Sequence, residues 1–260
     1  MNKIAERGYL YIAYGEAFTK EALFSIESLR KYTDLPIAIY TDRKDIVETK
    51  SEELKIALIG EIVANHLRAK VDYMDQSPFV ETIFMDSDTG HDDNPTNITN
   101  EQILAKQIEL ITEYDAQDYA RKRKKYSDIV PEYGEIPYAF SEANSGVIAF
   151  NNSTRTQTFL KMWKEYFYKY FKETNGWDQI SFRISLWRSN VRIHHMPFEY
   201  NVRSKENREK QKRYKHEFGE DHMESRIIHI HYDSEIHRGV CNIESVEQLE
   251  RIVKEKAVDY

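Results

Sequence analysis

The sequence predicts an α/β fold in which helices cover both faces of a mixed, mainly parallel sheet. The first strand-like segment is followed at once by a helical pattern and then by a second short strand, which is one βαβ unit. Further apolar segments of strand length recur along the chain, with helical patterns between them. The 260 residues, 40% hydrophobic and 31% charged, suit one ordinary soluble α/β/α domain.

The first part of the chain carries the clearest periodicity. Residues 9–14 (YLYIAY) are apolar and aromatic and end at Gly15, so we expect the first strand there. Thr19 is the expected N-cap of the following helix, whose apolar positions recur at helical spacing. The same reasoning predicts strands at 37–40, 56–59 and 80–85, a helix at 62–74, and a loop of turn-forming residues after Thr89.

The second part alternates in the same way. A helix is expected over about 100–119, and the charged stretch 121–137 is interpreted as a loop or insertion. Strands are predicted at 146–150, 191–194 and 227–232, with an aromatic-rich helix around Trp163 and another after Asp178. The charged segment 205–217 is interpreted as a lid, and Ser245 with Gln248 predicts a capping box for a C-terminal helix.

The composition limits the classes of function. A net charge of −7 argues against a protein whose main task is to coat nucleic acid, although two local basic runs occur at 121–125 and 205–215. The single cysteine, Cys241, excludes an intrachain disulfide. No apolar run approaches the roughly 18 residues that span a bilayer, and the charged N-terminus is unlike a signal peptide, so we expect a cytoplasmic protein.

Two aspartates at a strand end suggest a metal site. Asp86 and Asp88 follow the apolar strand at 80–85, and ligands of open α/β sheets bind beyond the carboxyl ends of strands. Two such carboxylates can converge on one hard divalent cation, which would hold the phosphates of a nucleotide sugar. A solvated turn is the competing interpretation. A phosphatase motif is disfavoured, because Gly90 stands where Thr or Val is needed and the motif is not on the first strand.

Histidines near the end of the chain offer a third ligand. His229 and His231 lie two apart on a predicted strand and therefore point to the same face. Neutral imidazole is a good ligand for Mn²⁺-like ions beside carboxylates. The alternative is a pair of hydrogen-bonded surface histidines. His194 and His195 form a competing pair, but they precede Pro197 in an expected loop.

In this order the segments resemble a known family. The chain is similar to the nucleotide-diphospho-sugar transferases of GT-A fold, especially the retaining, glycogenin-like and lipopolysaccharide galactosyltransferase-like group. The similarity spans roughly residues 8–235 and rests on an ordered set of short segments. They read YLYIAYG, IAIYTD, RAKVDYM, SPFVETIFMDSDT, NSGVIAF, WDQISF, MPFEYNVR and IIHIHYD.

The resemblance implies a nucleotide site in the first half. Ala13 and Tyr14 match positions that cradle base and ribose, and Asp42 matches the acid that contacts uracil. A carboxylate there can accept the ring N–H of uracil, which cytosine lacks. Arg68 and Lys70 match basic contacts to the donor phosphates or sugar. A strand-end turn for Asp42 and an exposed helix face for the two basic residues are the alternatives.

The resemblance also implies the metal ligands and the sugar contacts. Asp86 and Asp88 match the metal pair, and Ser87 between them is expected to contact the donor. His229 matches the C-terminal metal histidine, and His231 is the other candidate. The segment that approaches the donor sugar corresponds to Asn144, Ser145 and Gly146. A glycine there allows close approach of the backbone.

An acid–amide pair carries the implied catalytic role. Asp178 would bind sugar hydroxyls, and Gln179 would lie near the anomeric carbon, where an amide carbonyl can stabilise a positive sugar. A helix N-cap followed by a polar residue is the alternative. The family's lysine–tryptophan segment after the metal histidine is not clear here, and His237 and Arg238 are offered in its place.

The expected activity is metal-dependent transfer of a hexose from a nucleotide-diphosphate sugar, with UDP-sugar as donor, Mn²⁺ or Mg²⁺ as cofactor, and retention at the anomeric carbon. The acceptor is left open among glycan, lipid-linked sugar, protein and modified nucleic acid, as is the oligomeric state. A non-catalytic GT-A scaffold and a nucleotidyltransferase are the alternatives. One domain is expected, with a nucleotide-binding half at 8–120, a donor-sugar and acceptor half at 138–235, and a C-terminal helix at 240–260.

Overall fold

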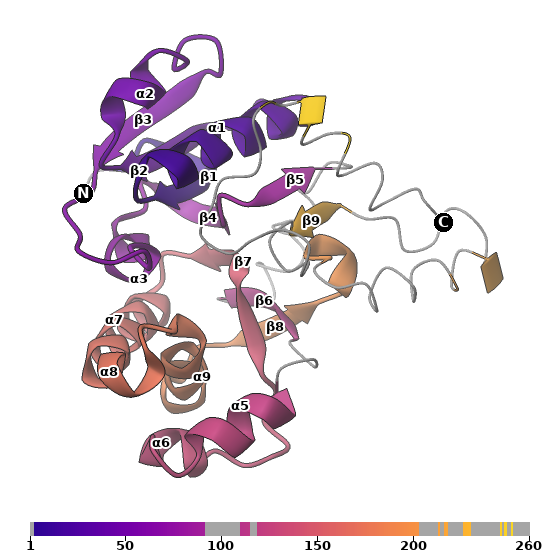
Figure 1. The fold of residues 1–260 in the computed structure, drawn as a ribbon. Helices are drawn as coiled ribbons and strands as arrows, with labels where there is room; N and C mark the ends of the chain where they lie inside the picture. The colour runs from indigo at the N-terminus through magenta and orange to yellow at the C-terminus, as the bar shows by residue number, and fades with distance from the viewer. Residues whose placement is uncertain are drawn as a thin grey trace.

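A single mixed sheet forms the centre of the molecule (Figure 1). The computed structural model describes residues 3–91, 110–114, 119–202 and 226–229, together with positions 213, 216, 217, 245, 247, 248 and 251. Within these residues the sheet has seven strands in the order β3-β2-β1-β4-β7-β6-β8. They are β1 (Ala5–Ala13), β2 (Ile37–Thr41), β3 (Ile56–Glu61), β4 (Phe79–Met85), β6 (Leu110–Tyr114), β7 (Ala143–Asn151) and β8 (Ile193–Met196).

The sheet is mainly parallel, as the sequence predicts. Strands β3, β2, β1 and β4 all run in the same direction, and β6 and β8 are also parallel to each other. Strand β7 is antiparallel to both β4 and β6. The start of β7 therefore lies at the edge of the sheet where β1 and β4 end, and this places two distant parts of the sequence side by side.

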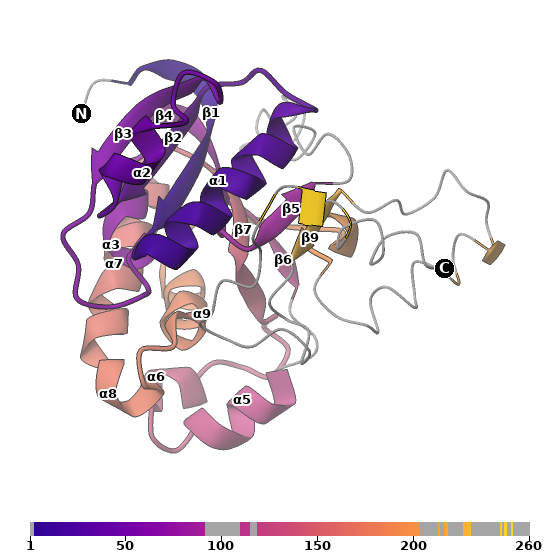
Figure 2. The ribbon, with the colours of Figure 1, turned by 45° about the horizontal axis from the view of Figure 1, so that its top comes forward.

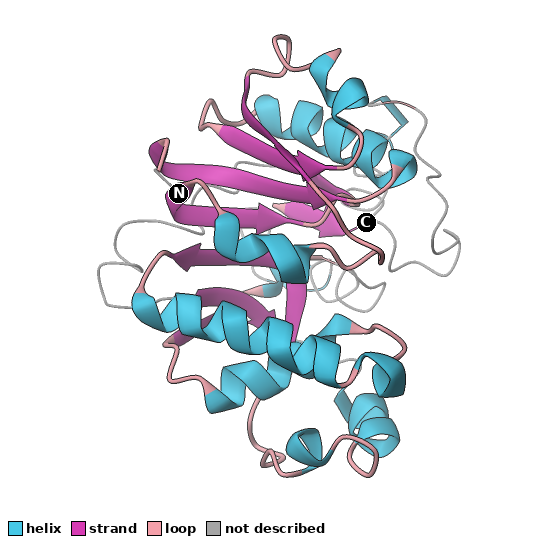
Figure 3. Cartoon of the chain, turned by 90° about the vertical axis from the view of Figure 1, so that its left-hand side faces the viewer, coloured by secondary structure: helices cyan, strands magenta, loops and turns pink. Residues whose placement is uncertain are grey.

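Helices cover both faces of the sheet (Figures 2 and 3). On one face α1 packs against alternate strand residues such as Tyr9 and Tyr11, and on the other face α3, α7 and α9 pack against residues such as Leu10. Figure 3 is viewed from the side of α3 and α7, with helices lying in front of the strands. The helices are α1 (Glu16–Arg30), α2 (Lys44–Glu48), α3 (Lys70–Tyr73), α5 (Tyr119–Tyr126), α6 (Pro131–Gly134), α7 (Thr154–Lys169), α8 (Phe171–Thr174) and α9 (Asp178–Arg188), with 3₁₀ turns η1 (Met74–Gln76) and η3 (Phe198–Tyr200).

A small second sheet extends from the acidic segment. Strand β5 (Thr89–His91) pairs antiparallel with β9 (Ile227–His229), and Thr89 faces His229 in the register. Gly90 thus lies in a strand, where the sequence predicted a loop. The remaining turn-forming residues after it lie outside the described residues.

The predicted helix at 62–74 is wrong over most of its length. Only Lys70–Tyr73 is α-helical, and Val63 and Leu67 are 84% and 63% exposed. The hydroxyl of Tyr73 accepts a hydrogen bond from the N–H of Val63 (2.7 Å) and donates one to its carbonyl (3.2 Å). Because a side chain satisfies these backbone groups, the segment before Lys70 is held as a loop despite its apolar spacing.

Two further predictions are corrected between residues 100 and 137. Leu110–Tyr114 is strand β6, where a helix was expected, because pairing with β7 and β8 overrides the helical pattern. The stretch interpreted as a loop contains α5 and α6. The apolar residues of this stretch pack together with α9 in one buried cluster. Charged residues between them hide this pattern in the sequence. The cluster residues of the stretch are Tyr126, Val130, Tyr133 and Ile136.

Several smaller predictions can be compared directly. Gly15, and not Thr19, is the N-cap of α1, and the Thr19 hydroxyl donates to the Gly15 carbonyl from inside the helix. The N–H of Gln248 donates to the Ser245 hydroxyl (3.2 Å), which is half of the predicted capping box. The expected lid at 205–217 lies almost wholly outside the described residues. No helix in the described part of the chain is both long and apolar enough to cross a membrane.

Candidate active site

The acidic segment follows β4 directly and is fixed on both sides. The N–H of Asp86 donates to the carbonyl of Gly146 on β7 (2.8 Å), which continues the pairing of the two strands by one residue. The Thr89 hydroxyl donates to the Asp86 carbonyl (2.9 Å) and closes the turn that contains Ser87 and Asp88. Both carboxylates are thereby held at the carboxyl edge of the parallel strands, where α/β sheets bind ligands.

Strand β9 brings His229 against these two carboxylates. Its Nε2 lies 3.1 Å from Asp88 Oδ1 and 3.9 Å from Asp86 Oδ2. One ligand atom from each of the three residues can be chosen so that all lie within 4.8 Å of one another. The register of β5 with β9 explains this, since His229 is paired with Thr89, the residue after Asp88. His231, the alternative ligand, lies outside the described residues.

A buried asparagine that the sequence did not single out orients the imidazole. Asn201 Oδ1 lies 3.0 Å from His229 Nδ1, and Asn201 Nδ2 donates to Asn144 Oδ1 (2.8 Å). Because an amide oxygen only accepts, Nδ1 carries a proton, and Nε2 is the ring nitrogen that faces the carboxylates and would bind a metal held between them. Val202 bridges to Ile228, which places Asn201 beside β9. Asn201 belongs to the segment MPFEYNVR that carries part of the family resemblance, but its role is visible only through this bridge.

Gly146 is required by side-chain packing at this point. A Cβ on Gly146 would lie 2.4 Å from His229 Cε1 and 3.0 Å from Asp86 Oδ2. Its N–H donates to Asn144 Oδ1 (2.9 Å). The resemblance implies close approach of a ligand to this glycine, whereas the space beside it is filled by the candidate metal ligands themselves.

The three acceptor side chains suit a hard divalent cation. Neighbouring ligands of an octahedral ion with bonds of about 2.1 Å are roughly 3 Å apart, close to the separation of His229 and Asp88. Burial raises the pKa of Asp86, Lys70 opposes this rise, and the negative charge of Asp88 adds to it. A cation between the carboxylates would relieve that repulsion. The donor set, two carboxylates and an oriented imidazole, therefore fits Mn²⁺ or Mg²⁺.

Lys70 connects the acidic segment to the opposite wall. Its buried ammonium donates to Asp86 Oδ1 (3.0 Å) and Oδ2 (3.1 Å) and to the Ser145 carbonyl (3.0 Å), and it lies 3.6 Å from Asp178 Oδ2. The half-exposed Arg68 places its Nε 3.4 Å from Asp178 Oδ1. The two basic residues predicted to contact the donor therefore lie together, and both are close to carboxylates of the site.

Asp178 is ionised in this setting. Burial acts to raise the pKa of its carboxyl, but Lys70, Arg68 and a hydrogen bond from the Ser145 hydroxyl (2.7 Å) outweigh it and hold the pKa below its ordinary value. Asp178 also begins α9, where the helix dipole favours a negative charge. The next residue, Gln179, donates its amide N–H to the Ala143 carbonyl (3.2 Å). Asp178 can accept hydrogen bonds here but cannot serve as a proton donor.

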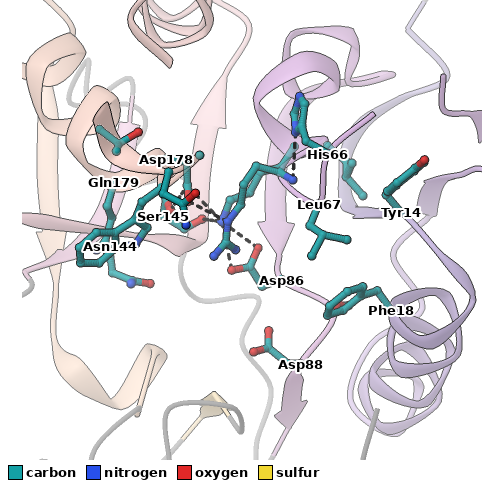
Figure 4. A pocket seen from close by; sticks show the side chains of 18 of the residues that line it. Tyr14, Phe18, His66, Leu67, Asp86, Asp88, Asn144, Ser145, Asp178 and Gln179 are labelled. Carbon is teal, nitrogen blue, oxygen red and sulfur yellow. Dashed lines mark hydrogen bonds and ion pairs between the residues drawn. The ribbon is translucent and has the colours of Figure 1, made fainter. Parts of the chain in front are cut away.

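These side chains line a cavity of about 930 Å³ (Figure 4). Tyr14, Phe18 and Leu67 lie on one side of Asp86 and Asp88. The polar set lies on the other side: Asn144, Ser145, Asp178 and Gln179. The cavity therefore has an apolar end next to the carboxyl end of β1 and a polar end next to the start of β7.

The remaining predicted residues divide into two groups. Ala13, Ser87, Arg68 and Lys70 line the cavity with those above, but Asp42 does not. Its Oδ1 instead accepts the N–H of Gly15 (2.7 Å) and holds the turn after β1.

Other candidates are placed elsewhere, or were missed. His194 and His195 lie on β8 and are not among the described lining residues, and the positions suggested to replace the missing cationic segment, His237 and Arg238, are not described. Lining residues that the sequence analysis did not select include Phe18, His66, Leu67, Lys122 and Trp177.

The comparisons with known proteins agree with this architecture. The family model of nucleotide-diphospho-sugar transferases matches residues 79–240, which is more than half of the chain. No curated protein sequence matches significantly. The solved structure of the galactosyltransferase LgtC in complex with donor and acceptor sugar analogs is similar, with a TM-score of 0.61 and 13% identity over 95% of both chains.

A second solved structure has a similar fold. The apo form of the glycosyltransferase GlyE of Streptococcus pneumoniae TIGR4 gives a TM-score of 0.62 at 14% identity, over 97% of this chain and 60% of GlyE. This chain thus spans about three fifths of GlyE. At such identities the likeness concerns the fold, while the match of the family model concerns the sequence. The chain belongs to the family of nucleotide-diphospho-sugar transferases and is a nucleotide-sugar-dependent glycosyltransferase of GT-A fold.

Proposed function

We propose that the protein transfers a hexose from a UDP-sugar, with Mn²⁺ or Mg²⁺ held by Asp86, Asp88 and His229, and with retention at the anomeric carbon. The observation that carries this proposal is the convergence of these three side chains within 4.8 Å beside a large cavity with one apolar and one polar end. The bound metal would neutralise the charge that develops on the departing diphosphate.

The apolar end of the cavity is the proposed nucleotide site. Ala13 and Tyr14 would contact base and ribose, with Ser87 next to the phosphates. Asp42 remains our proposed source of selectivity for uracil, acting at the turn that it holds through Gly15. In this proposal residues 8–120 supply the nucleotide half of one domain, residues 138–235 supply the sugar half, and 240–260 form a C-terminal helix.

The polar end is the proposed site of the donor sugar. The ionised Asp178 would accept hydrogen bonds from sugar hydroxyls, and Arg68 and Lys70 would face the diphosphate. The amide of Gln179 is oriented by its bond to Ala143, and its carbonyl would stabilise positive charge on the sugar. Asn144 and Ser145 complete the wall of this end, with Gly146 behind them. Because an amide such as that of Gln179 can stabilise the positive sugar without forming a lasting bond to it, these roles suit front-face substitution with retention.

Calorimetric binding of UDP, GDP, CDP and ADP, each with Mn²⁺ and again with EDTA, tests the proposal. We expect UDP to bind most tightly and only with the metal. In Asp88→Ala we expect metal-dependent binding and sugar transfer to be lost while the circular dichroism spectrum is unchanged. Metal-independent binding of all four nucleotides, or wild-type transfer by Asp88→Ala, would remove the metal from the proposal.

A further inference from the structure

The outer wall of the cavity has a chemistry of its own. It is built by α5 and by the turn between α8 and α9, which Figures 1 and 2 place at the end of the molecule away from β2 and β3. Lys122, Lys125 and Tyr126 line the cavity from α5, and Asn175 and Trp177 line it from the turn. We infer that this wall binds the acceptor, and that the acceptor is a saccharide carrying a phosphate or carboxylate group. The inference rests on the proposed function.

Trp177, packed against the buried Tyr126, provides an aromatic surface for a sugar ring. Trp177 and Tyr126 meet edge to face, with ring centroids 5.9 Å apart, and Trp177 directly precedes Asp178. The turn that carries Trp177 is fixed by two left-handed residues, Asn175 and Gly176, and by the bond from the Gly176 N–H to the Phe171 carbonyl (2.8 Å). A rigid aromatic face beside an exposed amide is suited to the apolar face and the hydroxyls of a saccharide.

The lysines make the wall positive. Lys122 is fully buried, lies 3.8 Å from Glu142 and 5.2 Å from the centroid of the Trp177 ring, and shares Glu142 with the buried Arg183 (3.4 Å). The charges of these three side chains sum to +1. Lys125 is exposed, packs over the Tyr126 ring at 4.8 Å, and forms no ion pair within the described residues.

The acids of the cavity are concentrated at its inner end. Its described lining includes only three carboxylates, Asp86, Asp88 and Asp178, and all of them contact His229, Lys70 or Arg68. The outer wall thus offers one exposed ammonium group, that of Lys125, and no carboxylate among its described lining residues, while the ammonium of Lys122 is buried beside Glu142. A neutral acceptor would leave Lys125 without a partner in the complex, whereas an anionic acceptor would pair with it.

The test compares three sugars that differ in charge. Glucose, glucose 6-phosphate and glucuronic acid are titrated by ligand-observed NMR into protein saturated with UDP and the diamagnetic Mg²⁺, for the wild type, Lys125→Gln and Lys124→Gln. Lys124 is the matched control, because it is the adjacent exposed lysine on α5 and is not among the lining residues. The affinity for UDP is measured for each protein in the same buffer.

We expect at least one anionic sugar to bind about fivefold or more tightly than glucose, with a preference that falls as salt is added. Lys125→Gln should remove most of this preference, and Lys124→Gln should keep it. The two anionic sugars distinguish phosphate from carboxylate recognition. Equal affinity for all three sugars, or equal losses in both variants, would overturn the inference and leave the transferase proposal intact. Weaker UDP binding in Lys125→Gln would also overturn it, by assigning the lysine to the donor. Failure of UDP to bind the wild type would instead overturn the proposed function.

Discussion

The imidazole of His229 is set by a chain of amides that begins on the opposite side of the site. Asn144 accepts hydrogen bonds from the Gly146 N–H and from Asn201, and Asn201 accepts the Nδ1–H of His229. The orientation of each asparagine amide therefore determines the orientation of the next group, and the last group is the imidazole of His229. Because the same chain touches the start of β7, the proposed sugar contacts and the proposed metal ligand have one shared support.

Removing the middle amide should weaken metal binding without removing a ligand. In Asn201→Leu the Nδ1–H of His229 loses its acceptor, so the tautomer and the ring orientation are no longer fixed, and we expect Mn²⁺ affinity to fall about 10- to 100-fold. Asn201→Asp keeps an acceptor for Nδ1–H and should lose less. Titration calorimetry of Mn²⁺ in the presence of UDP measures both. Affinity in Asn201→Leu equal to that of the wild type would show that the amide does not orient the ring.

The glycine beside the ring gives a second prediction. In Gly146→Ala the new methyl would meet His229 Cε1 at 2.4 Å, so the imidazole must move, and we expect both lower Mn²⁺ affinity and a loss of roughly 1–3 kcal/mol in the free energy of unfolding. Gly8→Ala is the matched control, because its methyl would meet the Phe79 ring at 2.5 Å, away from the site. It should lose stability and keep metal affinity, and parallel losses of affinity in both variants would contradict the assignment.

At the scale of elements, the short ladder of β5 and β9 is what carries the proposed metal histidine. The outer residue of this ladder, His91, is buried under α1. The backbone N–H of His91 donates to the Ser28 hydroxyl (3.1 Å). Its Nε2 lies 3.4 Å from both the Tyr11 and the Ser25 hydroxyls, and its Nδ1 has no hydrogen-bond partner within the described residues. Burial lowers the pKa of His91 to about 3, so the ring is neutral in the folded protein.

This burial predicts loss of stability in mild acid. The ordinary pKa of histidine is about 6.5, so between pH 6.5 and 3 the unfolded chain binds a proton at His91 that the folded chain does not. The free energy of unfolding should therefore decrease as the pH falls, and by pH 5 this one group should account for about 2 kcal/mol of the decrease. In His91→Gln that part of the decrease should be absent.

Urea unfolding of wild type and His91→Gln at pH 7, 6 and 5 measures the effect. The variant will be less stable at pH 7, but the difference from wild type should shrink towards pH 5. His216→Gln, at an exposed position, is the control and should follow the wild type at every pH. A difference between wild type and His91→Gln that does not change with pH would show that His91 is not buried as a neutral ring.

The elements that the sequence predicts well are those whose pattern and packing agree. Strands β1, β2 and β4 contain apolar runs in the centre of the sheet, and α7 carries one buried aromatic stripe. The loop at 62–69 could not be predicted, because its backbone is held at Val63 by the hydroxyl of Tyr73, the last residue of α3. Within the site, Asp86, Asp88 and His229 could be predicted from the sequence. Asn201 lies in the segment MPFEYNVR, but its role depends on a bridge to β9 that the sequence does not record.

At the scale of the whole molecule, the site lies where the two parts of the sheet meet. The acidic segment follows β4, the last strand of the part β3-β2-β1-β4, and the polar wall begins β7, the antiparallel strand that starts the part β7-β6-β8. His229 comes from near the end of the described chain. A metal and a nucleotide bound here would contact segments from residue 13 to residue 229 and would thereby couple the stability of both parts.

Ligand binding should therefore raise the thermal stability of the entire protein. With Mn²⁺ and UDP at about 100 times their dissociation constant, the free energy of unfolding should rise by roughly 2.7 kcal/mol, which for a chain of this size corresponds to about 5–10 °C in Tm. Because Asp88 is proposed to hold the metal, Asp88→Ala should lose the shift, as should the wild type in EDTA. Lys124→Gln should keep it.

Differential scanning calorimetry measures the shift and also its shape. If the ligands join both parts of the sheet, unfolding should remain a single transition that moves as one unit. A shift confined to one of two separate transitions would mean that the ligands stabilise only the nucleotide half. In that case His229 and Asp178 would contribute nothing to binding. An equal shift in wild type and Asp88→Ala would place the bound metal elsewhere on the chain.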